Sequence, residues 1–543
     1  MLRDILGDLP RWASAALGLA CLLVLWRTWK FTLRPLLWPS EPKNLPYWVP
    51  CHTVGFFRSS DKLIERGLDY TGRTHEPFAV ELLGKTMYVV TAPGDVAAAF
   101  RDSAALNFDG NLAQLLENFG VKHEAFKRAW HKPQPGDWSY VADNAVKPAQ
   151  LDLIHFVEET YKTQLLPGPH MDSMCRVFLD SVHSSLRWDA LRGGCAWCGL
   201  AGAADTAHNM KTAARPPVSL LSLCRRLIAE AATRSLFGRL LHDISPGVVD
   251  DILEFNDYAW MVVFRYLDLL EIPVTAPQRR LMATLSELIE LPEHSRGEAA
   301  WAIRQTLAAF EIVDIDTQSR AAMMLMSFWA LTLGHKHSLH GAVSNEYNLT
   351  FWILAHLLYD EALLRPVRQE TEAAWRAGRL DVKHLCANST RLHAVFNETL
   401  RLRNGAGALR VVTQQTVIGG KVLAQGHSIL IPFRQLHTNE AVWGPTVGAF
   451  DPSRFLNRKS LARHSSFRPF GGGTTYCPGR ILAREEVYGF IAVLLHRFDV
   501  ALHPDAGEQP FPRFNDTVPS LGVSGPLGGM DVLVDLAPRE VPA

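Results

Sequence analysis

The stretch FGGGTTYCPGR, residues 470–480, places three consecutive glycines and a Pro-Gly pair around one cysteine, Cys477. Glycine reaches backbone conformations that side chains forbid, and it lets a backbone approach a flat ligand closely. Pro478 and Gly479 precede an apolar helical pattern, so we expect the sulfur at a helix N-terminus. Free N–H groups and the positive end of the helix dipole lower the pKa of a thiol there, which favours a metal-ligating thiolate.

The kind of metal follows from the number of ligands. Residues 470–480 offer one cysteine and no histidine, so tetrahedral zinc is not expected. A single thiolate suits the axial position of a haem iron, where it favours cleavage of the O–O bond. The signature F-x-x-G-x-x-x-C-x-G is matched by four residues: Phe470, Gly473, Cys477 and Gly479. On this signature the chain resembles the cytochrome P450 superfamily. The resemblance implies that these four residues bind haem b, with Cys477 as the axial ligand.

Two further motifs appear in the order that this family shows. NETLRLR contains Glu398 and Arg401, which lie three residues apart and therefore on one helix face. FDPSRF supplies Arg454 about fifty residues later. In the family, the matching glutamate and arginines interlock beneath the haem, and buried charges persist only when they are paired. The resemblance, which extends from Leu45 onward, implies that these three residues form a structural clamp.

One basic residue is expected to bind the haem propionates. Arg410 follows the clamp helix at the start of a predicted sheet, and it matches a family arginine with that role. Two residues before the cysteine the family often has Arg or His, whereas this chain has Thr475. Propionate binding is therefore expected to depend on Arg410 and other donors.

The distal helix departs from the family pattern. Its acid–alcohol pair, [AG]-G-x-[DE]-T, supplies protons for oxygen activation. The matching stretch, GAVSNEYNLTFW, has Asn345 at the acid position and Glu346 at the alcohol position. Asparagine followed by Phe351-Trp352 resembles one branch of the family, the sterol hydroxylases of bile-acid synthesis and prostacyclin synthase. We expect both Asn345 and Glu346 to face the oxygen side of the haem as catalytic residues.

Three functions remain open at this point. In the first, the protein is a monooxygenase that takes electrons from NADPH through NADPH–cytochrome P450 reductase, with Asn345 positioning water and Glu346 donating the proton. In the second, it is a reductase-independent isomerase or dehydratase that acts on a peroxide, which needs no acid–alcohol pair. In the third, it is a catalytically inactive haem-binding paralogue. Glu346 also has two other interpretations, as a solvated or ion-paired helix residue and as a partner for a basic nitrogen of the substrate.

The remaining sequence predicts a mainly α fold with a minor β-sheet region, in a single large domain with one core. Residues 78–93 predict two short strands around Gly84 and Lys85. Apolar spacing predicts helices in three regions: 96–364, 384–403 and 481–498. Alternation with glycine turns predicts a small sheet in residues 410–433, and residues 192–219 predict an irregular loop.

The N-terminus differs from the rest of the chain. Residues 12–26, WASAALGLACLLVLW, carry no charge and have tryptophan at both edges, which suits a membrane interface. Basic residues follow the apolar run, which favours a retained anchor over a cleaved signal peptide and places the following domain in the cytosol. We expect a single-pass anchor helix in residues 1–33, a Pro-rich, non-helical linker in 34–50 and the catalytic domain in 51–543. The expected location is the endoplasmic reticulum membrane.

The amino-acid composition indicates which kinds of partner the protein binds. Lys and Arg number 55, as do Asp and Glu, so nothing indicates a nucleic-acid partner. The anchor and the apolar composition favour a lipophilic small molecule as substrate: a terpenoid, sterol, polyketide or alkaloid from specialised metabolism. The eight cysteines have irregular spacing, which indicates a reducing compartment. Two other candidate metal or redox sites are less favoured than the Cys477 loop: Cys195 with Cys198, and His335 with His337 and His340.

Overall fold

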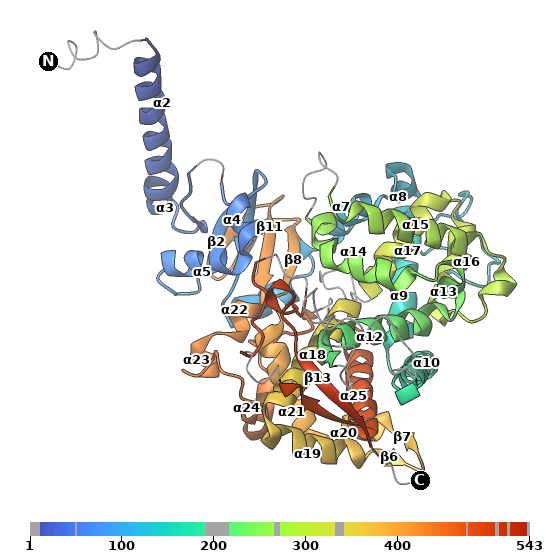
Figure 1. Ribbon diagram of the computed structural model, residues 1–543. Coiled ribbons are helices and arrows are strands. Elements are labelled where there is room, and N and C mark those ends of the chain that lie inside the picture. The colour runs from blue at the N-terminus through green and yellow to red at the C-terminus, as the bar shows by residue number, and fades with distance from the viewer. Residues whose placement is uncertain are drawn as a thin grey trace. The chain divides into compact units, whose positions relative to one another are not determined.

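The computed structural model describes residues 11–48, 51–189, 217–264, 272–331, 342–473, 476–504, 510–517 and 522–539. The chain divides into two compact units, a smaller one of residues 1–107 and 410–432 and a larger one of residues 108–409 and 433–543. Helices predominate and the sheets are small, which confirms the predicted fold class (Figure 1).

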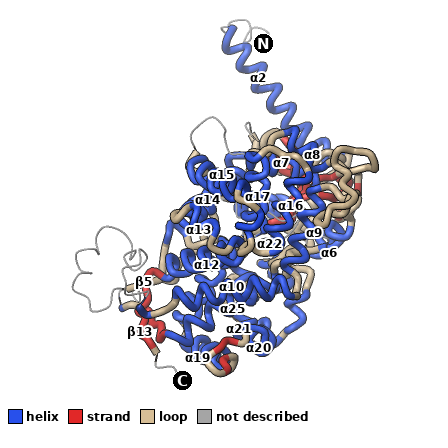
Figure 2. Tube along the Cα trace, turned by 90° about the vertical axis from the view of Figure 1, so that its right-hand side faces the viewer, coloured by secondary structure: helices blue, strands red, loops and turns tan. Residues whose placement is uncertain are grey.

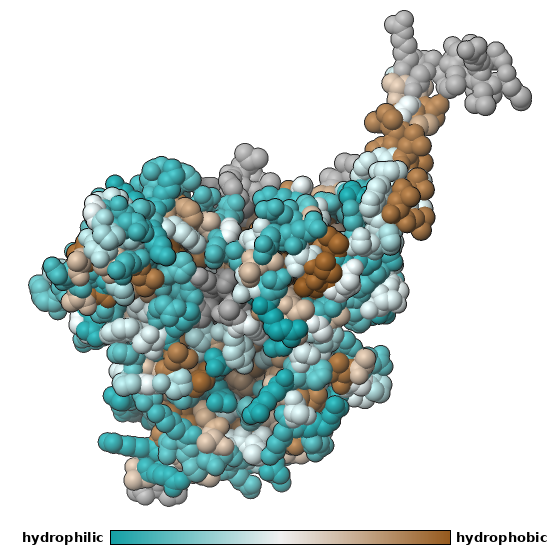
Figure 3. Space-filling view, turned by 180° about the vertical axis from the view of Figure 1, so that it is seen from behind, coloured by the Kyte–Doolittle hydropathy of each residue, from teal (hydrophilic) through white to brown (hydrophobic). Residues whose placement is uncertain are grey.

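The smaller unit begins with the apolar helix. It consists of α2 (Arg11–Thr28), the π-helical turn η1 (Trp29–Leu33) and α3 (Arg34–Leu37). Residues Ala15–Leu37 are long and apolar enough to cross a membrane, and Figure 3 shows apolar side chains along this exposed helix. The prediction of a non-helical chain from residue 34 is wrong for the first four residues. Pro35 lies at the junction where the π-helical turn η1 gives way to α3.

Basic and aromatic side chains fix the end of this helix to the smaller unit. The Arg27 guanidinium donates to the carbonyl oxygen of Tyr47 at 2.5 Å, and Lys30 Nζ donates to the Tyr47 hydroxyl at 2.8 Å. Phe31 is buried with its ring edge against Tyr47, at 5.3 Å between centroids. Lys30 also forms an ion pair with Glu81 at 3.2 Å. The apolar helix is therefore part of the folded unit at its C-terminal end.

A six-stranded sheet follows, in the order β1-β2-β3-β11-β8-β4. Its strands are β1 (Lys43–Asn44), β2 (Phe78–Leu82), β3 (Lys85–Val89), β4 (Leu106–Asn107), β8 (Gly407–Val412) and β11 (Ser428–Pro432). The predicted hairpin around Gly84 is confirmed, with Leu83 at φ 50° and Gly84 at φ 75°, as a tight two-residue turn requires. Helices α4 (Thr53–Arg58), α5 (Ser60–Tyr70) and α6 (Pro93–Arg101) complete the smaller unit.

The small sheet predicted for residues 410–433 is confirmed in part. Strand β9 (Thr416–Ile418) pairs with β10 (Lys421–Leu423), and β8 is the neighbour of β11. The sheet is not separate, however, because β11 also pairs in parallel with β3 and β8 also pairs with β4. The alternation in the sequence identifies strands but not their partners, because these partners lie more than 300 residues away along the chain.

The larger unit holds most of the helices. They are α7 (Asp109–Phe119), α8 (His123–Trp130), α9 (Leu153–Leu165), α10 (Pro169–Ser185), α12 (Leu220–Phe237), α13 (Leu240–Ile244), α14 (Val248–Val263), α15 (Thr275–Glu290), α16 (Trp301–Ile312), α17 (Thr317–Leu331), α18 (Ala342–Tyr359), α19 (Glu361–Glu372), α20 (Val382–Asn388), α21 (Thr390–Arg403), α22 (Phe433–His437), α23 (Glu440–Trp443), α24 (Ser453–Asn457) and α25 (Arg480–Arg497). Short strands lie between them: β5 (Val218–Ser219), β6 (Trp375–Arg376), β7 (Arg379–Leu380), β12 (Phe498–Leu502) and β13 (Leu533–Pro538).

The helix expected over residues 384–403 is in fact two helices, α20 and α21, separated at Ser389. The carboxylate of Glu370 accepts the backbone N–H groups of Arg391 and Leu392 at 3.0 Å each, and so caps the first turn of α21. This cap comes from a different helix, α19, and therefore has no local signal in the sequence.

The core of the larger unit is formed by two clusters of buried apolar side chains, and not by the single core that the sequence predicted. One cluster is built around α18, α21 and α25, and the other around α15, α16 and α17. Leu179 of α10 packs against both clusters. Helices α10, α12 and α25 lie side by side (Figure 2), and α18 packs against α12, α21 and α25.

Candidate active site

The Cys477 loop connects the residues after α24 to the start of α25. The Cys477 N–H donates to the Phe470 carbonyl at 3.0 Å, and this bond closes the loop. Gly471 at φ 79° and Gly473 at φ 64° occupy the left-handed region, which explains the glycine requirement. Phe470 anchors the loop by packing against the apolar cluster around α18. The structure thus places Phe470, Gly473, Cys477 and Gly479 in one compact turn.

The sulfur of Cys477 lies at the N-terminus of α25. The backbone N–H groups of Gly479 and Arg480 donate to it, and Arg480 lies close enough to favour the thiolate. Burial outweighs these contacts and raises the pKa of the thiol to about 11. A directly bound cation reverses this balance, because a coordinating thiol is deprotonated. The loop therefore fits a sulfur that ligates a metal.

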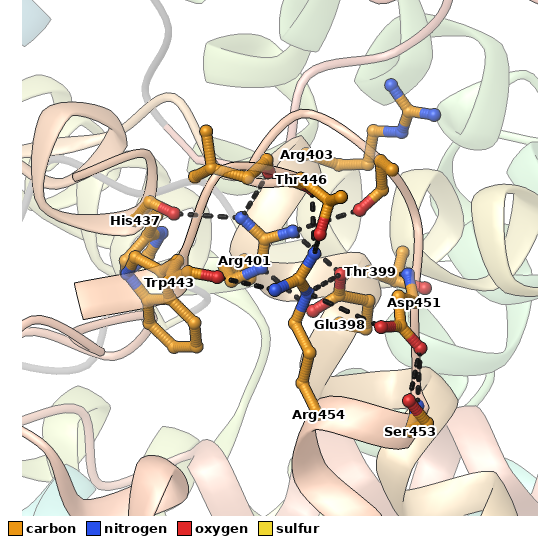
Figure 4. A network of polar contacts seen from close by, with 12 residues as sticks. Glu398, Thr399, Arg401, Arg403, His437, Trp443, Thr446, Asp451, Ser453 and Arg454 are labelled. Carbon is orange, nitrogen blue, oxygen red and sulfur yellow. Dashed lines mark hydrogen bonds and ion pairs between the residues drawn. The ribbon is translucent and has the colours of Figure 1, made fainter. Parts of the chain in front are cut away.

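Glu398, Arg401 and Arg454 are brought together in one network (Figure 4). Arg401 Nη2 lies 2.7 Å from Glu398 Oε1, and Arg401 Nε donates to Glu398 Oε2 at 2.8 Å. Arg454 Nε lies 3.5 Å from the same Oε1 atom. Glu398 and Arg401 have side-chain exposures of 0%, which makes this a buried ion pair whose charges require full pairing.

The same arginines hold the chain that follows α22. Arg401 donates to the carbonyl oxygens of His437 and Val447 at 2.9 and 2.8 Å, and to that of Ala449 at 3.2 Å. Glu398 Oε1 also accepts the N–H of Asp451 at 3.0 Å. The clamp therefore connects α21 to an irregular backbone segment whose carbonyl groups need buried donors.

Glu346 lies on α18 and is buried, with 7% of its surface exposed. Its carboxyl group is hydrogen-bonded to that of Glu486 on α25, which is 3% exposed. Burial raises the pKa of Glu346 to about 7. Burial also raises the pKa of Glu486, and the neighbouring carboxylates Glu346 and Glu485 add to that effect. Glu346 in turn raises the pKa of Cys477. The interpretation of Glu346 as a solvated residue is therefore wrong.

Sequence reasoning missed Glu486. The sequence feature that could have identified it is an acidic residue within the apolar helix RILAREEVYGFIAVLLHR. This helix is buried from Glu485 to Leu495. A helix that is buried on all sides leaves its acidic residues without water, so a carboxyl group there requires a partner.

Asn345 holds a distant backbone segment of the larger unit. Its Oδ1 accepts the N–H of Val523 at 2.6 Å, and Asn348 Nδ2 donates to the Val523 carbonyl at 2.9 Å. Trp352 Nε1 donates to the Ser524 carbonyl at 2.8 Å. These α18 side chains, spaced three and four residues apart, form one helix face that fixes residues 523 and 524. The catalytic role expected of Asn345 remains a prediction.

The close contact at Gly522 gives a test of this arrangement. A Cβ atom at Gly522 would lie 1.8 Å from Asn345 Oδ1 and would force that side chain away from Val523. We expect Gly522→Ala to lower the free energy of unfolding by about 1–3 kcal/mol. The measurement is the unfolding midpoint, with Gly297→Ala as the control, because a Cβ atom there meets nothing within 4 Å. Equal midpoints for both variants would contradict the arrangement.

Arg410 lies in β8 and is buried. Its guanidinium group lies 5.3 Å from the centroid of the Phe100 ring, and burial lowers its pKa to about 9. A buried cation of this kind gains from a nearby anion, so the residue suits a carboxylate such as a haem propionate. Thr475, the cysteine pair Cys195 and Cys198, and the histidines at 335, 337 and 340 lie outside the described residues.

The chain is similar to known proteins over most of its length. The sequence model of the cytochrome P450 family matches residues 339–522. Cytochrome P450 monooxygenase calL of Penicillium decumbens is 32% identical over 508 residues, which cover 88% of this chain and 89% of that protein. This chain is a cytochrome P450. The monooxygenases poxD of Penicillium oxalicum and nodJ of Hypoxylon pulicicidum are 25% and 24% identical, over 86% and 96% of this chain and 88% and 93% of their own lengths.

Membership of the family establishes the broad chemistry. The protein is an oxidoreductase of the P450 monooxygenase type, and its cofactor is a haem whose iron is bound by a cysteine. The Cys477 loop fits a haem iron, because it offers a single sulfur at a helix N-terminus and two backbone N–H groups donate to that sulfur. Among the described residues, no group of three or more His, Cys, Asp and Glu side chains forms a separate metal site.

Proposed function

We propose that the protein is a haem-thiolate monooxygenase that uses Cys477 as its axial ligand and oxidises a lipophilic small molecule. The single observation that carries this proposal is the Cys477 loop, in which two N–H groups point at a sulfur beside the first turn of α25. The substrate classes proposed are terpenoid, sterol, polyketide and alkaloid, in specialised metabolism. The electrons come from NADPH through NADPH–cytochrome P450 reductase.

Each group of residues has a separate task in this proposal. The bound haem supplies the activation of O₂ and the insertion of one oxygen atom into the substrate. Cys477 would hold the iron, and Phe470, Gly473 and Gly479 shape the loop around the sulfur. The Glu398–Arg401–Arg454 clamp keeps α21 and the segment after α22 in place. Arg410 binds a propionate group.

Two α18 residues act on the oxygen side. Glu346 is the proposed proton donor, because burial raises the pKa of its carboxyl group and so favours the protonated form that can give up a proton. Asn345, whose Oδ1 accepts the N–H of Val523, is the residue proposed to position water there. Glu346 thus stands where the family pattern has an alcohol, and Asn345 stands where it has an acid.

The exposed N-terminal helix supports a membrane location. Basic and aromatic contacts fix its C-terminal end, whereas Leu19, Leu22 and Leu25 are exposed. We propose a single-pass anchor in the endoplasmic reticulum membrane, with the catalytic domain, residues 51–543, in the cytosol. A helix of this length and composition supports the span.

Two truncations test the anchor. Removal of residues 1–24 is expected to move the protein from the membrane pellet to the soluble fraction without changing its unfolding midpoint, because the contacts of Arg27, Lys30 and Phe31 remain. Removal of residues 1–33 deletes those contacts and is expected to lower the midpoint as well. A truncated 25–543 protein that stays in the pellet would contradict the proposed anchor.

The second candidate function is a reductase-independent isomerase or dehydratase that acts on a peroxide. The observation that favours it is the hydrogen bond from the Val523 N–H to Asn345 Oδ1. The residue at the acid position is thus used for a structural contact. Turnover assays with a lipophilic extract separate the candidates. Product formation that requires NADPH, reductase and O₂ supports the monooxygenase, and product formation from an organic peroxide alone supports the second function. Purified protein that binds haem but gives no product under either condition indicates an inactive paralogue.

A further inference from the structure

Two carboxyl groups face each other in the interior of the larger unit. Glu346 on α18 and Glu486 on α25 come from helices that pack directly against each other, and both side chains are buried. Their carboxyl groups share a hydrogen bond. Two buried carboxylates cannot both be ionised at this distance without a large electrostatic cost, so at least one proton stays between them.

The direction of the hydrogen bond follows from the surroundings of the two carboxyl groups. Glu486 is the more deeply buried, at 3% exposure against 7% for Glu346, and the carboxyl group of Glu485 adjoins it on α25. The proton therefore stays on Glu486, whose hydroxyl donates to the Glu346 carboxylate. Glu486 Oε1 is buried and makes no hydrogen bond within the described part of the chain. The charge on Glu486 is therefore the more costly of the two, and Glu346 loses its proton first.

Other titratable groups border the pair on two sides. Glu485, the preceding residue of α25, is hydrogen-bonded to the Cys175 thiol of α10 and raises the pKa of Glu486. Cys477 in the loop before α25 lies within electrostatic reach of Glu346. The pKa of Glu485 is also affected by Lys383, which lowers it, and by Asp172, which raises it. These two residues form an ion pair of 2.9 Å. All the groups that raise the pKa values of the pair are carboxyls, so their effect adds to that of burial.

We propose that Glu486 is a positioning residue for the reaction: its carboxyl group keeps a proton and donates a hydrogen bond to Glu346, which leaves Glu346 as the group that releases and recovers a proton. This inference rests on the proposed role of Glu346 on the oxygen side. When Glu346 releases its proton, the pair changes from neutral to a charge of −1, and the Glu486 hydroxyl stabilises the new carboxylate. One proton from solvent then restores the pair, and no oxidant or reductant takes part.

Infrared difference spectroscopy of the purified holoenzyme tests this directly. The carboxylic C=O band of a protonated Glu is expected to lose part of its intensity in a single step near neutral pH in the wild-type protein. Glu346→Gln is expected to abolish that step, because Glu486 alone stays protonated. Glu486→Leu removes the donor to the Glu346 carboxylate, so the step is expected to move to higher pH. Glu485→Gln is the matched control and leaves the step close to its original pH.

Thermal unfolding across pH gives a second readout that does not depend on turnover. A carboxyl whose pKa is raised in the folded state stabilises the fold below its unfolded pKa, and this stability is lost as the pH rises through the folded pKa near 7. The glutamine side chain in the Glu346→Gln variant is neutral at every pH, so the variant does not lose this stability. The midpoint of the variant minus that of the wild type is therefore expected to rise by several degrees between pH 5 and pH 9.

The outcomes separate this inference from the proposed function. The thiolate band of the reduced, carbon monoxide-bound haem is recorded for every variant in parallel. Absence of that band in the wild type overturns the proposed function. Presence of the band, together with a neutral infrared step that survives in Glu346→Gln or does not move in Glu486→Leu, overturns the role of Glu486 alone. A lower pH of half-maximal turnover in Glu486→Leu would also contradict it, because the loss of the donor has to move the turnover profile upward.

Discussion

Replacement of Cys477 by serine is expected to reduce monooxygenase turnover to background. A serine hydroxyl in this loop cannot supply the thiolate electron density that favours cleavage of the O–O bond, and its alkoxide form is not accessible near neutral pH. The loop itself is expected to survive, because the closing bond from the residue 477 N–H to the Phe470 carbonyl does not involve the sulfur. The measurement is substrate-dependent oxygen consumption, combined with haem content per protein.

The matched control is Cys386→Ser. Cys386 is a free, half-buried cysteine in the same unit, and burial raises the pKa of its thiol to about 12. It lies in α20, outside the Cys477 loop, so its replacement is expected to preserve turnover and haem content. A Cys477→Ser protein that turns over at the wild-type rate would show that the ligand lies elsewhere.

Arg401→Leu is expected to give the largest loss of stability. The substitution leaves the Glu398 carboxylate buried at 0% exposure with Arg454 Nε, 3.5 Å away, as its remaining cation, and it removes the donors of three backbone carbonyls. Loss of one partner from a buried pair costs about 3–5 kcal/mol, and buried carbonyls without donors add to this. We expect most of the protein to be recovered unfolded or without haem.

The measurement is the yield of folded protein with its unfolding midpoint. Arg391→Leu is the matched control, because Arg391 lies on the same helix, α21, with an exposed side chain. Exposed substitutions of this kind usually change the free energy of unfolding by less than about 0.5 kcal/mol. If both variants unfold at the same midpoint, the network around Glu398 does not carry the stability assigned to it.

The sequence predicted the features that are local or carried by a motif. The β2–β3 hairpin follows from its alternation and its glycine turn, and α25 from apolar spacing after Pro478. Glu398, Arg401 and Arg454 could be named because their motifs stand in a fixed order, and the structure brings them together.

The features that the sequence did not predict depend on contacts between distant segments. The pairing of β11 with β3, the cap from Glu370 on α21 and the contact between Asn345 and Val523 each join segments whose partners no local pattern specifies. Glu346 was placed on its helix correctly, but its partner Glu486 lies 140 residues later. A carboxyl group within a buried helix indicates that a partner exists without indicating which residue it is.

The central claim is that Cys477 provides a thiolate ligand to a haem iron. The most direct test is the absorbance spectrum of the purified wild-type protein, reduced with dithionite and saturated with carbon monoxide. The account predicts the red-shifted band of a thiolate-ligated haem, and predicts its loss in Cys477→Ser with retention in Cys386→Ser. A wild-type spectrum without that band, or a band that persists after replacement of Cys477, would contradict the account.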